Sequence, residues 1–218
     1  MYMHTAGEGE IPLKVMGSLI CREDIRASFI HVFGHLKANG MVATARLKVS
    51  GDCSIAKACH AESIENLGSL RLHSLQARHV HSSGYLSAAG PMRVATFAAK
   101  GAVKLQSLEA ADSIEIVLGN TSTAERLTSS GWVHIRRSFP KLGFHMGSFR
   151  RLACGLIQGA SLRLEYTSAR LVCGTDIAVG PGCDIGEIRY SHSLTVAPGS
   201  KVGRSFHCND AGDTGGCP

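Results

Sequence analysis

Glycine recurs at an almost constant interval along the first half of the chain, and this period constrains the fold more than any other feature. The glycines are Gly17, Gly34, Gly51, Gly68, Gly84 and Gly101. The steps between them are 17, 17, 17, 16 and 17 residues. A short period sustained over six copies indicates a repeat architecture, in which each copy stacks on the next.

Apolar residues keep the same period and occur in pairs two positions apart. The strongest column consists of Leu13, Ile30, Leu47, Ile64, Val80, Phe97 and Ile114. Two further columns begin at Leu19 and Ile25. Because strand side chains alternate between two faces, apolar pairs at i and i+2 predict short strands with one buried face. Each copy therefore holds three such strands.

Three strands in about 17 residues form one coil of a parallel β-helix. Coils hydrogen-bond to one another at a spacing of ~4.8 Å, so that equivalent residues stack into a continuous aliphatic core. No coil can bury its own apolar residues, and stability comes from the stack. Helical repeats need about 33 residues per unit. We therefore predict an all-β, single-stranded parallel β-helix, right-handed by the general rule for parallel connections.

The pattern divides the chain into five segments. They are an N-terminal tail at 1–12, coils at 13–135, a basic, Phe-containing loop or insert at 136–158, further coils at 159–203 and a disordered tail at 204–218. Within the first block of coils, the polar stretch 119–130 predicts a loop, and Trp132 to Ile135 predict one more strand. Leu162, Ile177 and Leu194 then restore the period, with steps of 15 and 17 residues.

The composition and the absence of targeting signals set the compartment that we expect. The net charge is +6, a modest excess that permits contact with an acidic surface without requiring one. Residues 1–11 lack the basic and apolar regions of a secretory signal, and no apolar run reaches the ~18 residues of a spanning helix. We expect a cytoplasmic protein, perhaps-free of disulfides, whose eight cysteines are reduced thiols.

Motifs for catalysis, cofactors and metals do not appear in the sequence. There is no G-x-S-x-G nucleophile elbow, no phosphate loop and no dinucleotide fingerprint. Cys59-His60 and His207-Cys208 lack the spacing of a zinc site. We therefore predict no catalytic, cofactor-binding or metal-binding residues. His73, His79 and His81 follow strand alternation, and we expect them to be exposed.

A basic, phenylalanine-containing stretch is the candidate contact patch. Its residues are Arg136, Arg137, Phe139, Phe144, Phe149, Arg150 and Arg151. Exposed phenylalanine beside arginine suits a membrane surface or a protein partner. The alternative is a loop whose phenylalanines cap an open end of the core.

The segment from Leu162 to Val196 resembles the C-terminal signature of the bactofilins, which are bacterial polymer-forming cytoskeletal proteins. The matching features are LEYTSA, IAVGPGCDI and IRY followed by a short strand. The resemblance implies a right-handed β-helix that polymerises end to end without a nucleotide, and a non-enzymatic function. It implies that the chain binds itself, with the inner membrane surface or cell-envelope and motility proteins as further partners and no nucleic acid. A family membrane-binding tail would correspond here only to Met1, Tyr2 and Met3.

The alternative fold is the left-handed hexapeptide β-helix of many acyltransferases. Ile177 to Ile185 (IAVGPGCDI) has the appearance of hexads. That fold needs near-multiples of six residues, about 18 per coil, whereas this chain keeps 17. The acyltransferase reading remains the second hypothesis.

Overall fold

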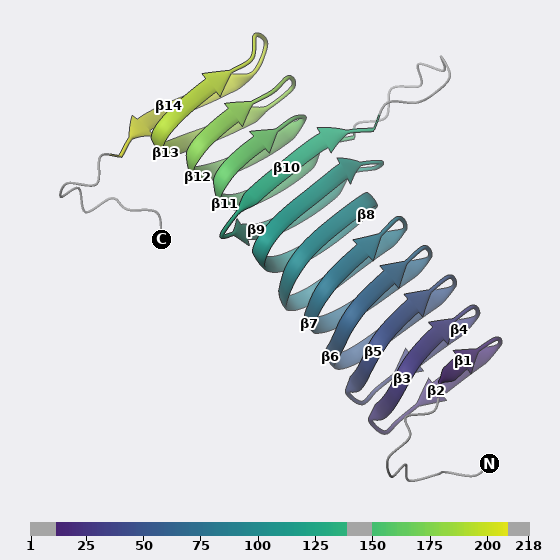
Figure 1. Cartoon of the computed structure of the whole chain (residues 1–218). Coiled ribbons are helices and arrows are strands. Elements are labelled where there is room, and N and C mark those ends of the chain that lie inside the picture. Colours follow the sequence, from purple (N-terminus) through teal and green to yellow (C-terminus); the bar gives the residue numbers. More distant parts are fainter. Residues whose placement is uncertain (1–11, 139–149, 209–218) are drawn as a thin grey trace.

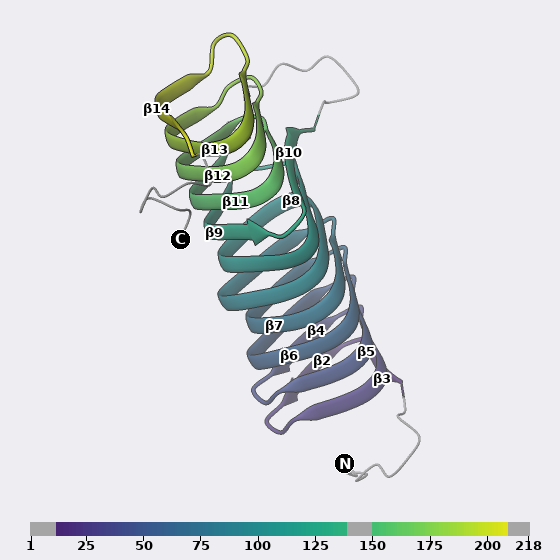
Figure 2. The same cartoon turned by 60° about the vertical axis from the view of Figure 1, so that its left-hand side comes forward.

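The computed structural model describes residues 12–138 and 150–208. These residues form fourteen strands of one parallel sheet that winds into a β-solenoid of about eleven turns (Figure 1). Figure 2 shows the turns stacked along one axis, with β1 to β4 at one end and β13 and β14 at the other. The predicted parallel β-helix with coils of about 17 residues is confirmed.

The strands follow the chain from one end of the rod to the other. They are β1 (Leu13–Val15), β2 (Ser18–Cys21), β3 (Ile25–Val32), β4 (His35–Ala38), β5 (Val42–Val49), β6 (Asp52–Asn66), β7 (Ser69–Ser82), β8 (Tyr85–Leu118), β9 (Ser122–Ser129), β10 (Trp132–Arg137), β11 (Leu152–Leu164), β12 (Thr167–Val179), β13 (Asp184–Val196) and β14 (Lys201–His207). The longer strands bend around corners of the coil, so that one strand covers more than one face.

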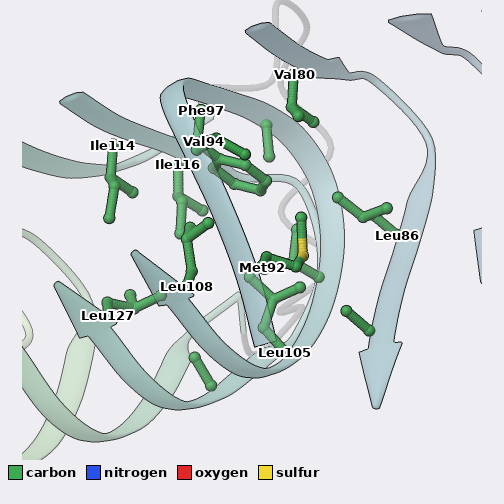
Figure 3. Close-up of a cluster of buried hydrophobic side chains, with 14 of the residues drawn as sticks. Val80, Leu86, Met92, Val94, Phe97, Leu105, Leu108, Ile114, Ile116 and Leu127 are labelled. Carbon is green, nitrogen blue, oxygen red and sulfur yellow. The ribbon is translucent and has the colours of Figure 1, made fainter. Parts of the chain in front are cut away.

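The strongest apolar column stacks as its period predicts. Register pairs join Leu13 to Ile30, and then each member to the next as far as Phe97. From Ile114 the column continues through Val133, Leu162, Ile177 and Leu194. The predicted core residues from Ile30 to Ile114 are each at most 2% exposed. Figure 3 shows Val80, Phe97 and Ile114 among the buried side chains of the middle turns.

The recurring glycines form a corner at which successive turns approach closely. A Cβ atom at Gly34, Gly51 or Gly68 would overlap the carbonyl oxygen of the glycine one turn earlier. Gly17 stands in the first turn, and a Cβ there would meet nothing within 4 Å. The period of the glycines is therefore a packing requirement between turns.

Asparagine and serine interrupt one inward column without exposing it. Asn66 and Ser82 are both 0% exposed. The Asn66 side-chain amide donates to the Ser82 hydroxyl and to the Tyr85 carbonyl, each at 2.9 Å. Hydrogen bonds of this kind offset the cost of burying a polar group. The expected bond from this asparagine to the backbone of a neighbouring turn is present.

The structure corrects three boundaries from the sequence. Residues 119–130 hold strand β9, so the predicted loop is wrong, and its Ser122 and Ser129 are buried in inward positions. The insert predicted at 136–158 is shorter, because β10 continues to Arg137 and β11 begins at Leu152. The tail predicted from residue 204 is still strand β14 as far as His207, since it pairs in parallel with β13.

Candidate assembly surfaces

The N-terminal end of the rod presents strand edges and an incompletely covered core. β1 pairs with β3, and β2 pairs with β4; within the described ranges no other strand pairs with either. Leu13 and Leu19 are only partly buried, although their counterparts in the next turn, Ile30 and Leu36, are 0% exposed. Met16 is 73% exposed beside this edge. The first turn therefore lacks the cover that every inner turn has.

The C-terminal end has the same character. Its last turn comprises residues 193–207, and β14 pairs with β13 alone among the described strands. Val196 is 41% exposed, whereas Val179 in the turn beneath it is 2% exposed. Phe206 is 47% exposed. The sequence analysis missed this surface, although Val202 and Phe206 repeat the spacing of Ile185 and Arg189 and could have revealed it.

The arginines of the predicted contact patch are engaged with the protein itself. Arg136 forms an ion pair with Glu115 at 3.0 Å. The Arg137 guanidinium lies 4.8 Å from the centre of the Tyr166 ring, a cation–π geometry. The Arg150 guanidinium donates to the Ser138 carbonyl at 3.2 Å.

The remaining patch residues are divided between the described and undescribed parts of the chain. Arg151 is exposed, and its guanidinium donates to the Gly182 carbonyl at 3.5 Å. Phe139, Phe144 and Phe149 lie outside the described residues. The structure thus brings the four arginines to the corner where β10 ends and β11 begins, and the membrane or partner contact stays a prediction.

The cysteines that the structure describes are free thiols, and most are buried. Burial raises the pKa of Cys53, Cys59 and Cys154 to about 12 in each case. These thiols are protonated at neutral pH, and a thiol is a nucleophile or metal ligand only as the thiolate. They therefore act in the core as small apolar side chains.

One polar cluster has the residue types of a hydrolase site but a different geometry. The Asp176 carboxylate accepts hydrogen bonds from Ser193 Oγ at 2.5 Å and His192 Nδ1 at 2.6 Å. These bonds hold the pKa of Asp176 below its ordinary value. The serine is thus bound by the carboxylate, whereas a catalytic serine needs the imidazole as its base. The arrangement joins neighbouring turns and does not form a nucleophile.

The rod surface offers shallow concavities. One of about 310 Å³ lies at the C-terminal turns and is lined by Gln158, Cys173, Arg189, Tyr190 and Cys208, among others. In residues 12–138 and 150–208, no three His, Cys, Asp or Glu side chains are grouped as metal ligands. His73, His79 and His81 are exposed, as predicted. No helix in the described part of the chain has the length and apolar character needed to span a bilayer.

Comparison with known proteins adds little to this geometry. No family model matches the chain, and no solved structure matches it. A 52-residue segment is 36% identical to the uncharacterized protein YhbF of Bacillus subtilis (strain 168). That segment is 24% of this chain and 22% of the relative. The fold itself therefore defines the class: a parallel β-solenoid with two open ends.

Proposed function

We propose that this chain is a non-enzymatic structural scaffold, bactofilin-like, that self-assembles end to end into polymers without a nucleotide. The observation that carries the proposal is the open core at both ends. Leu13 and Leu194 are the partly buried terminal members of a column that is buried between them. A second copy on either end would complete the burial.

The strand edges supply the attachment chemistry. An unpaired edge presents backbone N–H and C=O groups that template pairing with another chain. Repetition of one contact that does not close on itself grows a filament. The stacking of turns within the chain is already such a repetition, and the binding of another copy extends it without a phosphate-binding site. The resemblance of residues 162–196 to bactofilins supports the same function.

The acyltransferase hypothesis receives less support. A hexapeptide helix needs turns close to 18 residues, so that its hexads stay in register. Val133 pairs with Leu162, and Leu162 pairs with Ile177, which are steps of 29 and 15 residues. The hexad-like run from Ile177 to Ile185 therefore does not continue through the neighbouring turns.

Electron microscopy and sedimentation of the purified protein test the proposal. In nucleotide-free buffer we expect filaments or large oligomers, and neither ATP nor GTP should change their length or number. A protein that stays monomeric over a wide range of concentration and salt would contradict the scaffold function and return weight to the acyltransferase hypothesis.

A terminal substitution with a matched control sharpens this test. Leu13→Lys places a charge in the exposed end of the core, and we expect shorter or no assemblies with an unchanged circular dichroism spectrum. Leu67→Lys changes a side chain that is 49% exposed on the flank of the fourth turn, and assembly should match that of the parent. Equal assembly by all three proteins would place the contact elsewhere than at the N-terminal end.

A further inference from the structure

The rod contains a whole number of turns. Val15 and Val196 lie in one column, as Leu13 and Leu194 do, when the register pairs are followed from turn to turn. Pro12 precedes the first member of that column, and Cys208 follows the last strand at the corner occupied by Ser28 in the first turn. The path of the last turn thus ends where the path of the first turn begins.

We propose that copies join head to tail: the last turn (residues 193–207) of one copy stacks in parallel on the first turn (residues 12–27) of the next. This polarity rests on the proposed function. Following the register places Arg204 in the column of Asp24 and Phe206 in the column of Arg26. The joint repeats the stacking that already connects the turns within one chain.

Apolar contacts continue across this joint. Leu194 comes to lie on Leu13, Val196 on Val15, and Val202 in the column of Cys21. Val196 is 41% exposed in the free rod, and every inner member of its column up to Val179 is at most 4% exposed. Head-to-tail stacking therefore gives the terminal residues the surroundings of the inner ones.

Charge selects this polarity over contact between two C-terminal ends. Residues 193–207 contain Lys201 and Arg204 and no acidic residue, whereas the first turn contains Glu23 and Asp24. Two C-terminal turns in contact would oppose cation to cation. Like charges placed opposite each other across paired strands are destabilising. Head-to-tail stacking instead brings Arg204 to Asp24.

The contacts proposed at the joint have counterparts within the rod. Ion pairs between adjacent turns join Lys48 to Glu65 at 3.0 Å and Arg93 to Glu109 at 3.3 Å. Arg71 lies 5.8 Å from the centre of the Tyr85 ring. An arginine can therefore face a carboxylate or a ring one turn away in this fold, as Arg204 and Arg26 would.

Two end-blocked variants distinguish the polarities. Leu13→Lys blocks the N-terminal end, and Val196→Lys blocks the C-terminal end at a side chain that already reaches solvent. If copies join head to tail, each variant alone is monomeric, and an equimolar mixture forms dimers with one free end of each kind blocked. Analytical ultracentrifugation measures the masses.

The other outcomes overturn the polarity and leave the proposed function separately testable. Dimers of each variant alone would show that like ends join. Monomers both alone and in the mixture, with a polymerising parent, would show that another surface makes the contact. A monomeric parent would instead refute self-assembly itself.

The ion pair provides a second test. Arg204→Asp should raise the critical concentration for assembly about two- to fivefold, the range of an exposed ion pair. Adding Asp24→Arg should restore it, because the charges are then exchanged. Lys201→Asp is the control: Lys201 lies in the column of Ile20, and Asp24→Arg should not rescue it. An unrescued Arg204→Asp variant would contradict the pairing.

Discussion

Each inward residue of this fold is buried by its counterparts in the turns before and after it. Leu47 is 0% exposed between Ile30 and Ile64, to which its register pairs join it. Buried positions of this kind leave no path by which a charged side chain could reach water. The stability of the rod therefore depends on single residues of the column.

Replacement of Leu47 tests the column. Leu47→Asp buries an unpaired carboxylate, and we expect a loss on the order of 3–5 kcal/mol in the free energy of unfolding. Ala45→Asp changes an exposed residue of the same strand and should cost no more than about 0.5 kcal/mol. Urea denaturation compares the three proteins. A Leu47→Asp variant as stable as the parent would show that the register is wrong.

At the scale of a structural element, the corners decide how closely the turns approach. The glycine corner leaves no room for a side chain in any turn that has another turn before it, as Gly34, Gly51 and Gly68 show. A second corner, between β12 and β13, has a register shift, and there Asp176 binds both Ser193 and His192.

The glycine corner supplies a prediction with an internal control. Gly51→Ala forces a Cβ against the Gly34 carbonyl, and the shift of backbone needed to relieve it should cost about 1–3 kcal/mol of unfolding free energy. Gly17→Ala occupies the same column, but its Cβ meets nothing within 4 Å, so its cost should be under about 1 kcal/mol. Denaturation midpoints of dilute protein measure both. Similar losses would show that chain flexibility, and not contact between turns, explains the glycines.

The Asp176 corner predicts a dependence of stability on pH. Hydrogen bonds from Ser193 and His192 lower the pKa of Asp176 in the folded state. The ionised carboxylate therefore stabilises the fold above its unfolded pKa of about 4, and this contribution disappears as the pH falls through the lower folded value. Asp176→Asn should be less stable than the parent at pH 7, with a difference that shrinks toward pH 3.

Urea midpoints at the two pH values measure this difference. Ser193→Ala removes the largest cause of the pKa shift and should weaken the pH dependence in the same direction. A difference between Asp176→Asn and the parent that is equal at pH 7 and pH 3 would contradict the linkage.

At the scale of the whole molecule, each turn contacts its neighbours, and the two terminal turns have one neighbour each. Nearest-neighbour stacking makes stability vary along a solenoid. β14 is exposed along most of its length, whereas β6 and β7 alternate between buried and exposed residues. The ends are therefore the parts of the rod that open most easily, and also the parts that assembly would cover.

Hydrogen exchange measures this gradient. In dilute protein, the amides of β14 should exchange faster than those of β6 and β7, because local opening of a terminal turn disrupts one interface instead of two. Under assembling conditions β14 and β1 should gain protection, whereas the middle strands should change little. The Leu13→Lys variant is the control and should gain none. Equal protection along the rod in the dilute protein would contradict the gradient.

The spacing of residues by itself determined the fold class and much of the core. Apolar residues at equal offsets can all be buried only if equivalent positions stack, so the column from Leu13 to Ile114 could be read without coordinates. The N-terminal assembly surface followed as well, because Leu13 and Val15 already stand in inward columns at the start of the first turn.

Only the tertiary structure decided where the period bends and where the rod ends. Ser122 and Thr167 occupy inward positions because their hydroxyls bond to backbone groups, at 3.2 Å from the Val103 amide and 2.9 Å from the Glu165 carbonyl. A pattern of hydrophobicity cannot register such satisfied polar groups. The exposed Phe206 likewise belongs to a strand through its parallel pairing with β13, because a terminal turn has no turn beyond it that would favour an apolar sequence.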